Sequence, residues 1–322
     1  LDPDPDDPRL ASIGSALAAW TSAGLLTVAV RRDGPAPLLV GTVREQLRPS
    51  GQGLWALRLQ VPRLERACLE LGIYVPGAER PEPRWVWRGP AMRPAPPEPP
   101  PIEVAPPQPI ATGERAERHA VTCWSPARPH ALVLCADGED VPRLAAWVAA
   151  AHVPVALVGI ASAARIVPYG EFDTYEQRAD PRACAYLPEV DPTYFADHMA
   201  YVTGTVLPWA RDRLGQLPAL AFGVSNGAVW AASAGVLHPE LFAGVVAFSL
   251  GTAPPPAAAG AIPPHALVAG RLEPDFDRVT TLYARDLRSR GVPVRLRRPT
   301  RGHDSSMWVE ELAPALRWAL QR

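Results

Sequence analysis

Residues 217–242 read LPALAFGVSNGAVWAASAGVLHPELF, an apolar run in which Ser225 stands between Gly223 and Gly227. The residues before the serine favour a buried strand over 219–224, and those after it favour a helix over 226–238. A chain that passes from strand to helix within one residue needs small neighbours where the two elements cross. The pattern therefore predicts a sharp turn that presents the Ser225 hydroxyl above a sheet.

The segments around this turn alternate between strand and helix patterns. Continuous apolar runs at 130–136, 153–160, 243–249 and 265–270 are typical of strands buried on both faces, and 292–298 favours a last strand. Helices are expected at 140–151, 192–214, 277–291 and 306–320. This alternation predicts an α/β fold, a mostly parallel sheet flanked by helices.

The first 88 residues follow a different pattern. Short strand-like runs bounded by proline and glycine lie at 25–43, 53–62, 67–76 and 84–90, after a possible helix over 10–20. The proline-dense stretch 94–109 favours an extended tether. We expect a small β-rich, sandwich-like N-terminal domain at 1–88, a Pro-rich linker at 89–112 and an α/β catalytic domain at 113–322.

The composition of the chain argues against several classes of binding partner. The formal net charge is −1 and no dense basic run is present, which argues against a nucleic-acid or anionic-membrane partner. The four cysteines have no CxxC spacing, and no apolar stretch reaches the length of a membrane span. We expect a soluble, cytoplasmic monomer or homodimer without metal or organic cofactor.

A serine hydroxyl needs a histidine base to act as a nucleophile, and His303 is the candidate. It lies in the loop 298–308, between the last strand and the last helix, where the chain order serine, acid, histidine places the base. The acid should follow the strand at 265–270. Glu273 in the first turn after that strand is favoured, but Asp275 and Asp277 stay open, since acids at these positions also cap helices.

Two backbone amides are candidates to stabilise a developing oxyanion. One belongs to Asn226, at the start of the helix after the serine. The other belongs to Glu139, because Gly138 after the buried strand permits a backbone turn that presents this amide. The alternative is a plain turn before a helix capped by Asp140.

Five dispersed segments resemble the enterochelin-esterase-like branch of the putative esterase (esterase D) family, which has the α/β-hydrolase fold. They are ALVLCADGED (131–140), PRACAYLPEVDPTYFADHMAYVTGTVLPWA (181–210), GVSNGAVWAASAGVLHPELFAGVVAFS (223–249), LVAGRLEPDF (267–276) and GHDSSMW (302–308). The resemblance implies that Ser225 is the nucleophile, His303 the base, Glu273 the acid, and the amides of Asn226 and Glu139 the oxyanion hole. It also implies a β-sandwich ahead of the hydrolase domain.

The chain departs from the family pattern at Ala185, where the family has a glutamate before the tyrosine. Arg178, Arg182 and Tyr186 are therefore candidates to face the substrate, with a structural salt bridge as the alternative for the arginines. Segments 161–190 and 252–264 follow strand ends and should line the binding face. We expect a serine carboxylic-ester hydrolase acting on a siderophore-type or short-chain or aryl ester. An acyltransferase and a catalytically inactive binding protein are the alternatives.

Overall fold

The computed structural model describes residues 1–4, 7–76, 85–92, 94, 97–113, 115, 118–162, 180–256 and 261–321. The chain divides into two compact units. The first comprises Leu1–Pro96 with Gly270–Pro274 and Arg298–Met307, and the second comprises Pro97–Ala269, Asp275–Arg297 and Trp308–Arg322. Two loops from the C-terminal half of the chain therefore belong to the N-terminal unit.

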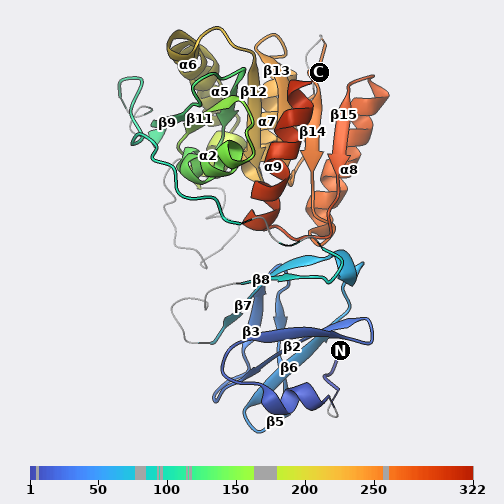
Figure 1. Cartoon of the computed structure of the whole chain (residues 1–322). Coiled ribbons are helices and arrows are strands. Elements are labelled where there is room, and N and C mark those ends of the chain that lie inside the picture. Colours follow the sequence, from blue (N-terminus) through green and yellow to red (C-terminus); the bar gives the residue numbers. More distant parts are fainter. Residues whose placement is uncertain are drawn as a thin grey trace. The chain divides into compact units, whose positions relative to one another are not determined.

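The first unit contains two antiparallel four-stranded sheets (Figure 1). One has the order β1-β2-β6-β5, with bounds Ala18–Ser22, Leu25–Arg31, Leu54–Leu59 and Arg48–Gly51. The other has the order β4-β3-β7-β8, with bounds Glu45–Gln46, Leu38–Gly41, Cys68–Tyr74 and Trp85–Arg88. Buried side chains from both sheets, such as Val28 and Leu71, form one core. The predicted sandwich-like arrangement is confirmed.

The prediction of a helix over 10–20 is wrong. A short 3₁₀ helix, η1 (Pro8–Ser12), is followed by strand β1, in which Ala18 pairs with Ala29 of β2. Alanine favours a helix in isolation, but pairing with a neighbouring strand outweighs that weak preference. A second 3₁₀ turn, η2, spans Leu64–Arg66.

The second unit is built on a seven-stranded sheet of order β15-β14-β13-β12-β10-β11-β9. The bounds in chain order are β9 Val121–Trp124, β10 Ala131–Cys135, β11 Val155–Ile160, β12 Ala219–Val224, β13 Phe242–Phe248, β14 His265–Val268 and β15 Val294–Arg297. All neighbours run parallel except β9, which pairs antiparallel with β11 at the edge. The mostly parallel sheet is as predicted.

Helices cover both faces of this sheet (Figure 1). Their bounds are α2 Val141–Ala150, α4 Pro181–Tyr186, α5 Pro192–Tyr201, α6 Leu207–Leu214, α7 Asn226–Leu237, α8 Pro274–Ser289 and α9 Ser305–Leu320. Residues of α4 to α8 share one core cluster with one face of the sheet. A Cβ on Gly244 would meet Ala319 of α9 at 3.7 Å, which places α9 on the other face.

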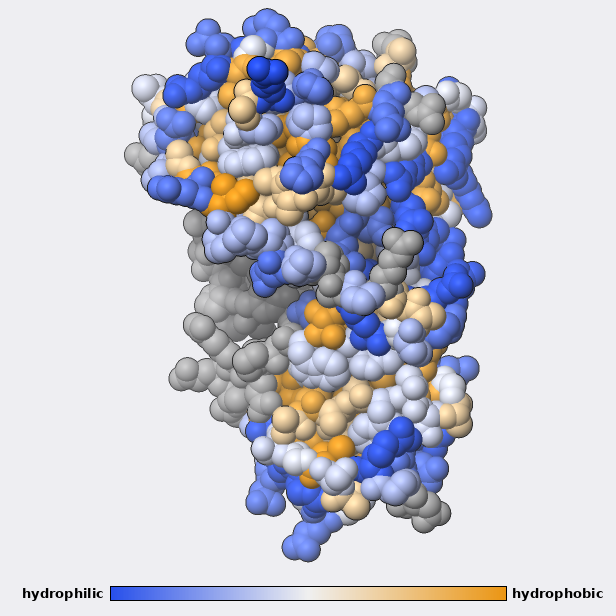
Figure 2. Space-filling view, viewed as in Figure 1, coloured by the Kyte–Doolittle hydropathy of each residue, from blue (hydrophilic) through white to orange (hydrophobic). Residues whose placement is uncertain are grey.

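The long helix expected over 192–214 is present, and it contains one π-helical turn, η4 (Val202–Val206), between α5 and α6. A 3₁₀ turn, η3 (Gly138–Asp140), follows β10. No helix in the described ranges is long and apolar enough to cross a membrane. On the face seen in Figure 2, hydrophobic residues form scattered patches among hydrophilic ones.

Candidate active site

Ser225 is the single residue between β12 and α7. Its backbone has φ +57° and ψ −122°, a conformation that costs a non-glycine residue about 1–3 kcal/mol. Its N–H donates to the carbonyl oxygen of Phe248 on β13 at 2.9 Å. A Cβ on Gly223 would lie 2.0 Å from the carbonyl oxygen of Gly227, so the crossing of strand and helix leaves no room for a side chain. The half-buried Ser225 therefore occupies the predicted sharp turn.

Asn226 is the first residue of α7. The carbonyl oxygen of Ser225 accepts the N–H of Ala228 at 2.9 Å, which closes the first turn of the helix. The amides of a first helical turn have no acceptor within the helix and point beyond its N-terminus. The amide of Asn226 is thus directed toward the turn that carries the serine.

In the first unit, Nδ1 of His303 lies 2.7 Å from Oε2 of Glu273. The second oxygen of this carboxylate, Oε1, accepts the N–H of Gly270 at 2.6 Å. The Glu273 side chain is 2% exposed and that of His303 is 31% exposed. The carboxylate is therefore buried and fixed, while the imidazole reaches the surface of its unit.

The loop that carries His303 is tied to the strands of the first unit. The N–H of Cys68 on β7 donates to the carbonyl oxygen of Thr300 at 3.0 Å. The hydroxyl of Thr42 lies 3.4 Å from Oδ2 of Asp304, and Thr42 also accepts the N–H of Glu70 at 2.8 Å. Sequence reasoning missed Thr42, because nothing in its local pattern links it to a loop 260 residues away.

The two other carboxylates considered for the acid lie in the first turn of α8. Asp275 is 89% exposed and lies 4.0 Å from Arg278 on the same helix. Asp275 and Asp277 therefore occupy the positions expected of acids that stabilise a helix N-terminus. Glu273 is the one of these three carboxylates whose contact with His303 is observed among the described residues.

The turn after β10 places its left-handed residue one position earlier than expected. Asp137, not Gly138, has the positive φ, +56°. Gly138 is required because the chain passes close to β11: a Cβ there would lie 2.6 Å from the carbonyl carbon of Gly159. Glu139 follows within η3, and its carboxylate accepts the N–H of Ser162 at 3.0 Å. The predicted turn is present, but Asp137, and not Gly138, adopts the left-handed backbone conformation in it.

Of the three side chains expected to face a substrate, Arg178 lies outside the described residues. Arg182 forms a forked ion pair with Asp137, so the structural alternative describes its observed contact. Tyr186 is fully buried, and its hydroxyl accepts the N–H of Asp137 at 3.0 Å. The Tyr186 side chain does not reach the surface, and its role toward a substrate stays a prediction.

Two other histidines, His119 and His265, are buried. Nδ1 of His265 donates to the carbonyl oxygen of Pro263 at 2.7 Å, and Nε2 of the neutral ring accepts from the hydroxyl of Tyr283 at 3.1 Å. Burial lowers the pKa of His265 to about 4. His152 lies in an exposed turn with φ +51°.

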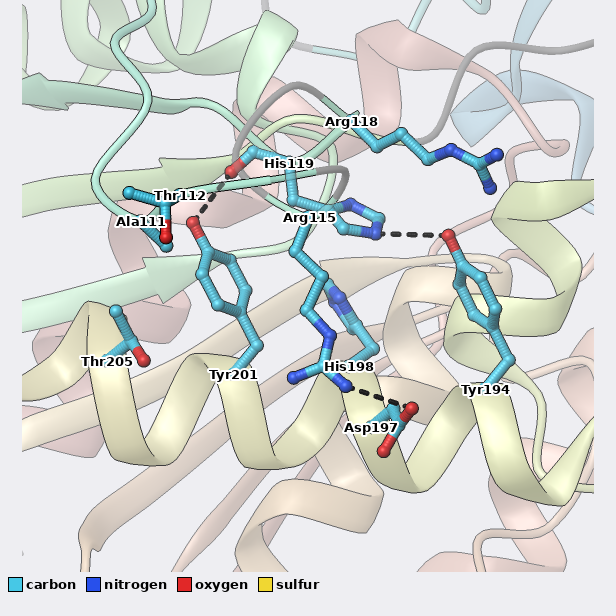
Figure 3. A pocket seen from close by; sticks show the side chains of 10 residues that line it. All are labelled: Ala111, Thr112, Arg115, Arg118, His119, Tyr194, Asp197, His198, Tyr201 and Thr205. Carbon is cyan, nitrogen blue, oxygen red and sulfur yellow. Dashed lines mark hydrogen bonds and ion pairs between the residues drawn. The ribbon is translucent and has the colours of Figure 1, made fainter.

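His119 lines a cavity of about 610 Å³, together with Ala111, Thr112, Arg115 and Arg118 and with residues of α5 and η4 (Figure 3). Its ring bonds the hydroxyl of Tyr194 at 3.3 Å and packs on His198, with ring centroids 4.6 Å apart. Burial lowers the pKa of both histidines, most strongly that of His198, so both rings stay neutral near pH 7. The residues predicted as catalytic are not among those that line this cavity.

The segment after β13 was expected to line the binding face. Of the described residues in 252–264, residues 252–256 and Ile262 line a second cavity, of about 590 Å³, together with residues of α8. Within the described ranges, no three or more histidine, cysteine, aspartate and glutamate side chains cluster in a way that could hold a metal ion.

The seven-stranded sheet with its strand–serine–helix turn defines the α/β-hydrolase class. The family model described as putative esterase matches residues 119–319. The chain therefore belongs to the putative esterase family, which makes it an ester hydrolase by class. No relative among curated proteins matches the chain by sequence.

Solved structures with a similar fold include enterobactin esterases. The enzyme from Shigella flexneri, solved in the presence of 2,3-di-hydroxy-N-benzoyl-serine, is 16% identical over 99% of each chain, with a TM-score of 0.66. The ferric enterobactin esterase from Salmonella typhimurium is 16% identical over 95% of this chain and 97% of its own, with a TM-score of 0.66. At this level of sequence identity, the two matches show that the chains share a fold.

Proposed function

We propose that this protein is a serine hydrolase of carboxylic esters, with Ser225 as the nucleophile, His303 as the base and Glu273 as the acid. The observation that carries the proposal is the conformation of Ser225, held at φ +57° between two glycines where a strand becomes a helix. This is the geometry of a nucleophile elbow, in which backbone strain exposes the hydroxyl for attack.

The acid–imidazole pair supports the assigned roles. Because the Glu273 carboxylate accepts a hydrogen bond, its contact with Nδ1 of His303 favours the tautomer with a proton on Nδ1. Nε2 is then unprotonated and acts as the base. Glu273 keeps the ring oriented and stabilises the imidazolium without taking the proton.

The reaction follows from these roles. The Ser225 oxygen bonds to the ester carbonyl carbon while its proton passes to His303, and the oxyanion accepts hydrogen bonds from the amides of Asn226 and Glu139. The carbon–oxygen bond to the alcohol then breaks, and His303 returns the proton to that alcohol. Water, deprotonated by His303, attacks the acyl-enzyme and releases the acid. No step of this scheme calls on a metal or an organic cofactor.

The proposed substrates are a siderophore-type ester and a short-chain or aryl ester. The whole-chain fold match to enterobactin esterases is the reason for the first class. The acyl-enzyme chemistry itself requires only an accessible ester, which is the reason for the second. A panel of p-nitrophenyl esters of graded acyl length together with a catecholate trilactone separates the two.

The test is hydrolysis of this panel by the full chain and by Ser225→Ala. We expect the substitution to lower kcat by about 10⁴-fold or more, with an unchanged urea unfolding midpoint. Ser233→Ala is the matched control, since that buried hydroxyl donates to the Val229 carbonyl of its own helix. Product that shifts to a new ester when alcohol is added would indicate an acyltransferase. No turnover of any ester would favour a binding protein.

A further inference from the structure

Asp137 adopts the left-handed conformation in the turn that precedes the amide of Glu139. For a residue with a side chain this conformation costs about 1–2 kcal/mol. The next residue cannot relax to relieve it, because Gly138 is packed against the backbone of Gly159. Contacts elsewhere must therefore hold Asp137 in place.

Two residues of the short helix α4 hold Asp137 at both its side chain and its backbone. Arg182 donates from Nε to Oδ1 at 2.6 Å and from its terminal nitrogen to Oδ2 at 2.8 Å, a forked charge-assisted pair. The hydroxyl of Tyr186 accepts the N–H of Asp137 at 3.0 Å. Arg182 and Tyr186 are four residues apart, so both project from the same face of α4.

This pair of side chains is itself fixed. The Arg182 guanidinium carbon lies 5.2 Å from the centre of the Tyr186 ring, and the ring packs against His198 and Trp230. Asp180 caps α4 by accepting the N–H of Arg182 at 3.0 Å. Burial lowers the pKa of Arg182, but the hydrogen bonds and the charge of Asp137 outweigh this effect and raise the pKa overall, so the guanidinium stays charged at every working pH.

The carboxylate that Arg182 holds also meets the turn after Ser225. A Cβ on Gly227 would lie 3.2 Å from Oδ2 of Asp137 and 2.8 Å from Cβ of Ala136. Asp137 thus packs against Gly227 in the first turn of α7. It is in contact with both elements that carry the proposed oxyanion donors.

We propose that Arg182 and Tyr186 are positioning residues that lock Asp137 in its left-handed conformation and so set the spacing of the Glu139 and Asn226 amides. This inference rests on the proposed function. Two donors stabilise an oxyanion only when both lie about 2.7–3.1 Å from the position the charged oxygen takes. If the turn at Asp137 shifted by a few tenths of an ångström, the enzyme would bind the substrate as before but would stabilise the transition state less.

The first test compares Arg182→Lys and Tyr186→Phe with the wild-type chain on an aryl ester. Lysine keeps the positive charge but cannot form the two-pronged hydrogen bond to the Asp137 carboxylate. Phenylalanine keeps the ring packing but lacks the hydroxyl that accepts the N–H of Asp137. We expect kcat to fall about 10- to 100-fold in each with KM within about twofold. The affinity for an aryl trifluoromethyl ketone, which forms an anionic adduct on serine, should fall by the same factor as kcat.

Tyr194→Phe and Arg115→Lys are the matched controls. The Tyr194 hydroxyl bonds only the ring of His119 among the contacts of the described residues, and Arg115 pairs with Asp197 at 2.9 Å. Both should retain the wild-type kcat and ketone affinity. A rise in KM at constant kcat in Arg182→Lys would overturn the proposal, since it would indicate that Arg182 binds the substrate.

A second readout is independent of turnover. Hydrogen exchange of the amides at 137–140 should accelerate about tenfold in both variants and in neither control, at an unchanged unfolding midpoint. Wild-type kcat in both variants, or unchanged exchange, overturns the positioning role and leaves the proposed function intact. A wild-type chain that hydrolyses no ester overturns the proposed function, and the oxyanion role with it.

Discussion

Nδ1 of His303 and Oε2 of Glu273 are 2.7 Å apart, and the remaining oxygen of Glu273 accepts the N–H of Gly270 at 2.6 Å. Both oxygens of a buried carboxylate therefore have defined partners. This arrangement fixes the imidazole through the backbone of the loop after β14, because the carboxylate cannot rotate without losing one of the two contacts. The orientation of His303 is thereby coupled to a residue 30 positions earlier.

Glu273→Gln is expected to lower kcat by about 10²- to 10⁴-fold with little change in KM. The amide oxygen can still accept the N–H of Gly270, but an amide N–H facing Nδ1 favours the wrong imidazole tautomer. Steady-state kinetics on an aryl ester measure the effect. Asp275→Asn is the control and should keep wild-type kinetics; the reverse pattern would make Asp275 the acid.

Asn226→Ala is expected to change kcat by less than about threefold. The proposed donor at this position is the backbone amide, which alanine retains, whereas removing a true oxyanion donor costs about 10²- to 10³-fold. The same aryl-ester assay decides the question. A loss of that larger size would indicate that the Asn226 side chain, and not its amide, contacts the oxyanion.

Gly223→Ala is expected to lower the free energy of unfolding by about 3 kcal/mol or more, since its Cβ would lie 2.0 Å from the carbonyl oxygen of Gly227. Gly204→Ala in η4 is the matched control, because nothing lies within 4 Å of a Cβ there. It should leave stability unchanged or raise it by about 0.5–1 kcal/mol. Urea unfolding compares the two. Equal stability of both variants would mean that the crossing of β12 and α7 is looser than described.

His265 should make the stability depend on pH. Burial lowers its pKa to about 4, whereas an unfolded chain titrates near pH 6.5. The stabilisation from the neutral ring is complete above about pH 6.5 and is lost as the pH falls toward 4, because only the unfolded chain then takes up the proton. A difference of this size is about 3 kcal/mol.

Urea midpoints between pH 7.5 and 4.5 check this dependence. His265→Gln, which keeps a donor and an acceptor, should flatten the profile, although buried His119 and His198 contribute in the same direction. His130→Gln is the control, since His130 is exposed. Identical profiles for the two variants would contradict the assignment.

The α/β part of the fold was predictable because its strands are apolar on both faces and its helices are periodic. The runs at 130–136 and 219–224 each became a central strand within one residue of the expected bounds. The prediction of a helix over 10–20 was wrong because this segment has no such pattern. Alanine-rich segments carry little pattern, and the pairing of β1 with β2 that decides its structure is a tertiary contact.

Chain order and turn chemistry predicted the strand–serine–helix turn at Ser225 and the pairing of His303 with Glu273, both of which the structure contains, while their catalytic roles stay predictions. The candidate site was not predictable where distant side chains meet. Nothing in the sequence around Asp137 indicates that Arg182 and Tyr186 hold it, because that contact depends on how α4 packs on the sheet. A buried tyrosine and a solvent-facing one likewise have the same local sequence signal.

The loops 270–274 and 298–307 belong to the compact unit of the first 96 residues. Removing residues 1–96 would therefore also remove the packing partners of the loops that carry Glu273 and His303. A truncated chain that starts at residue 97 would keep the seven-stranded sheet but leave these two loops without the strands they fold against.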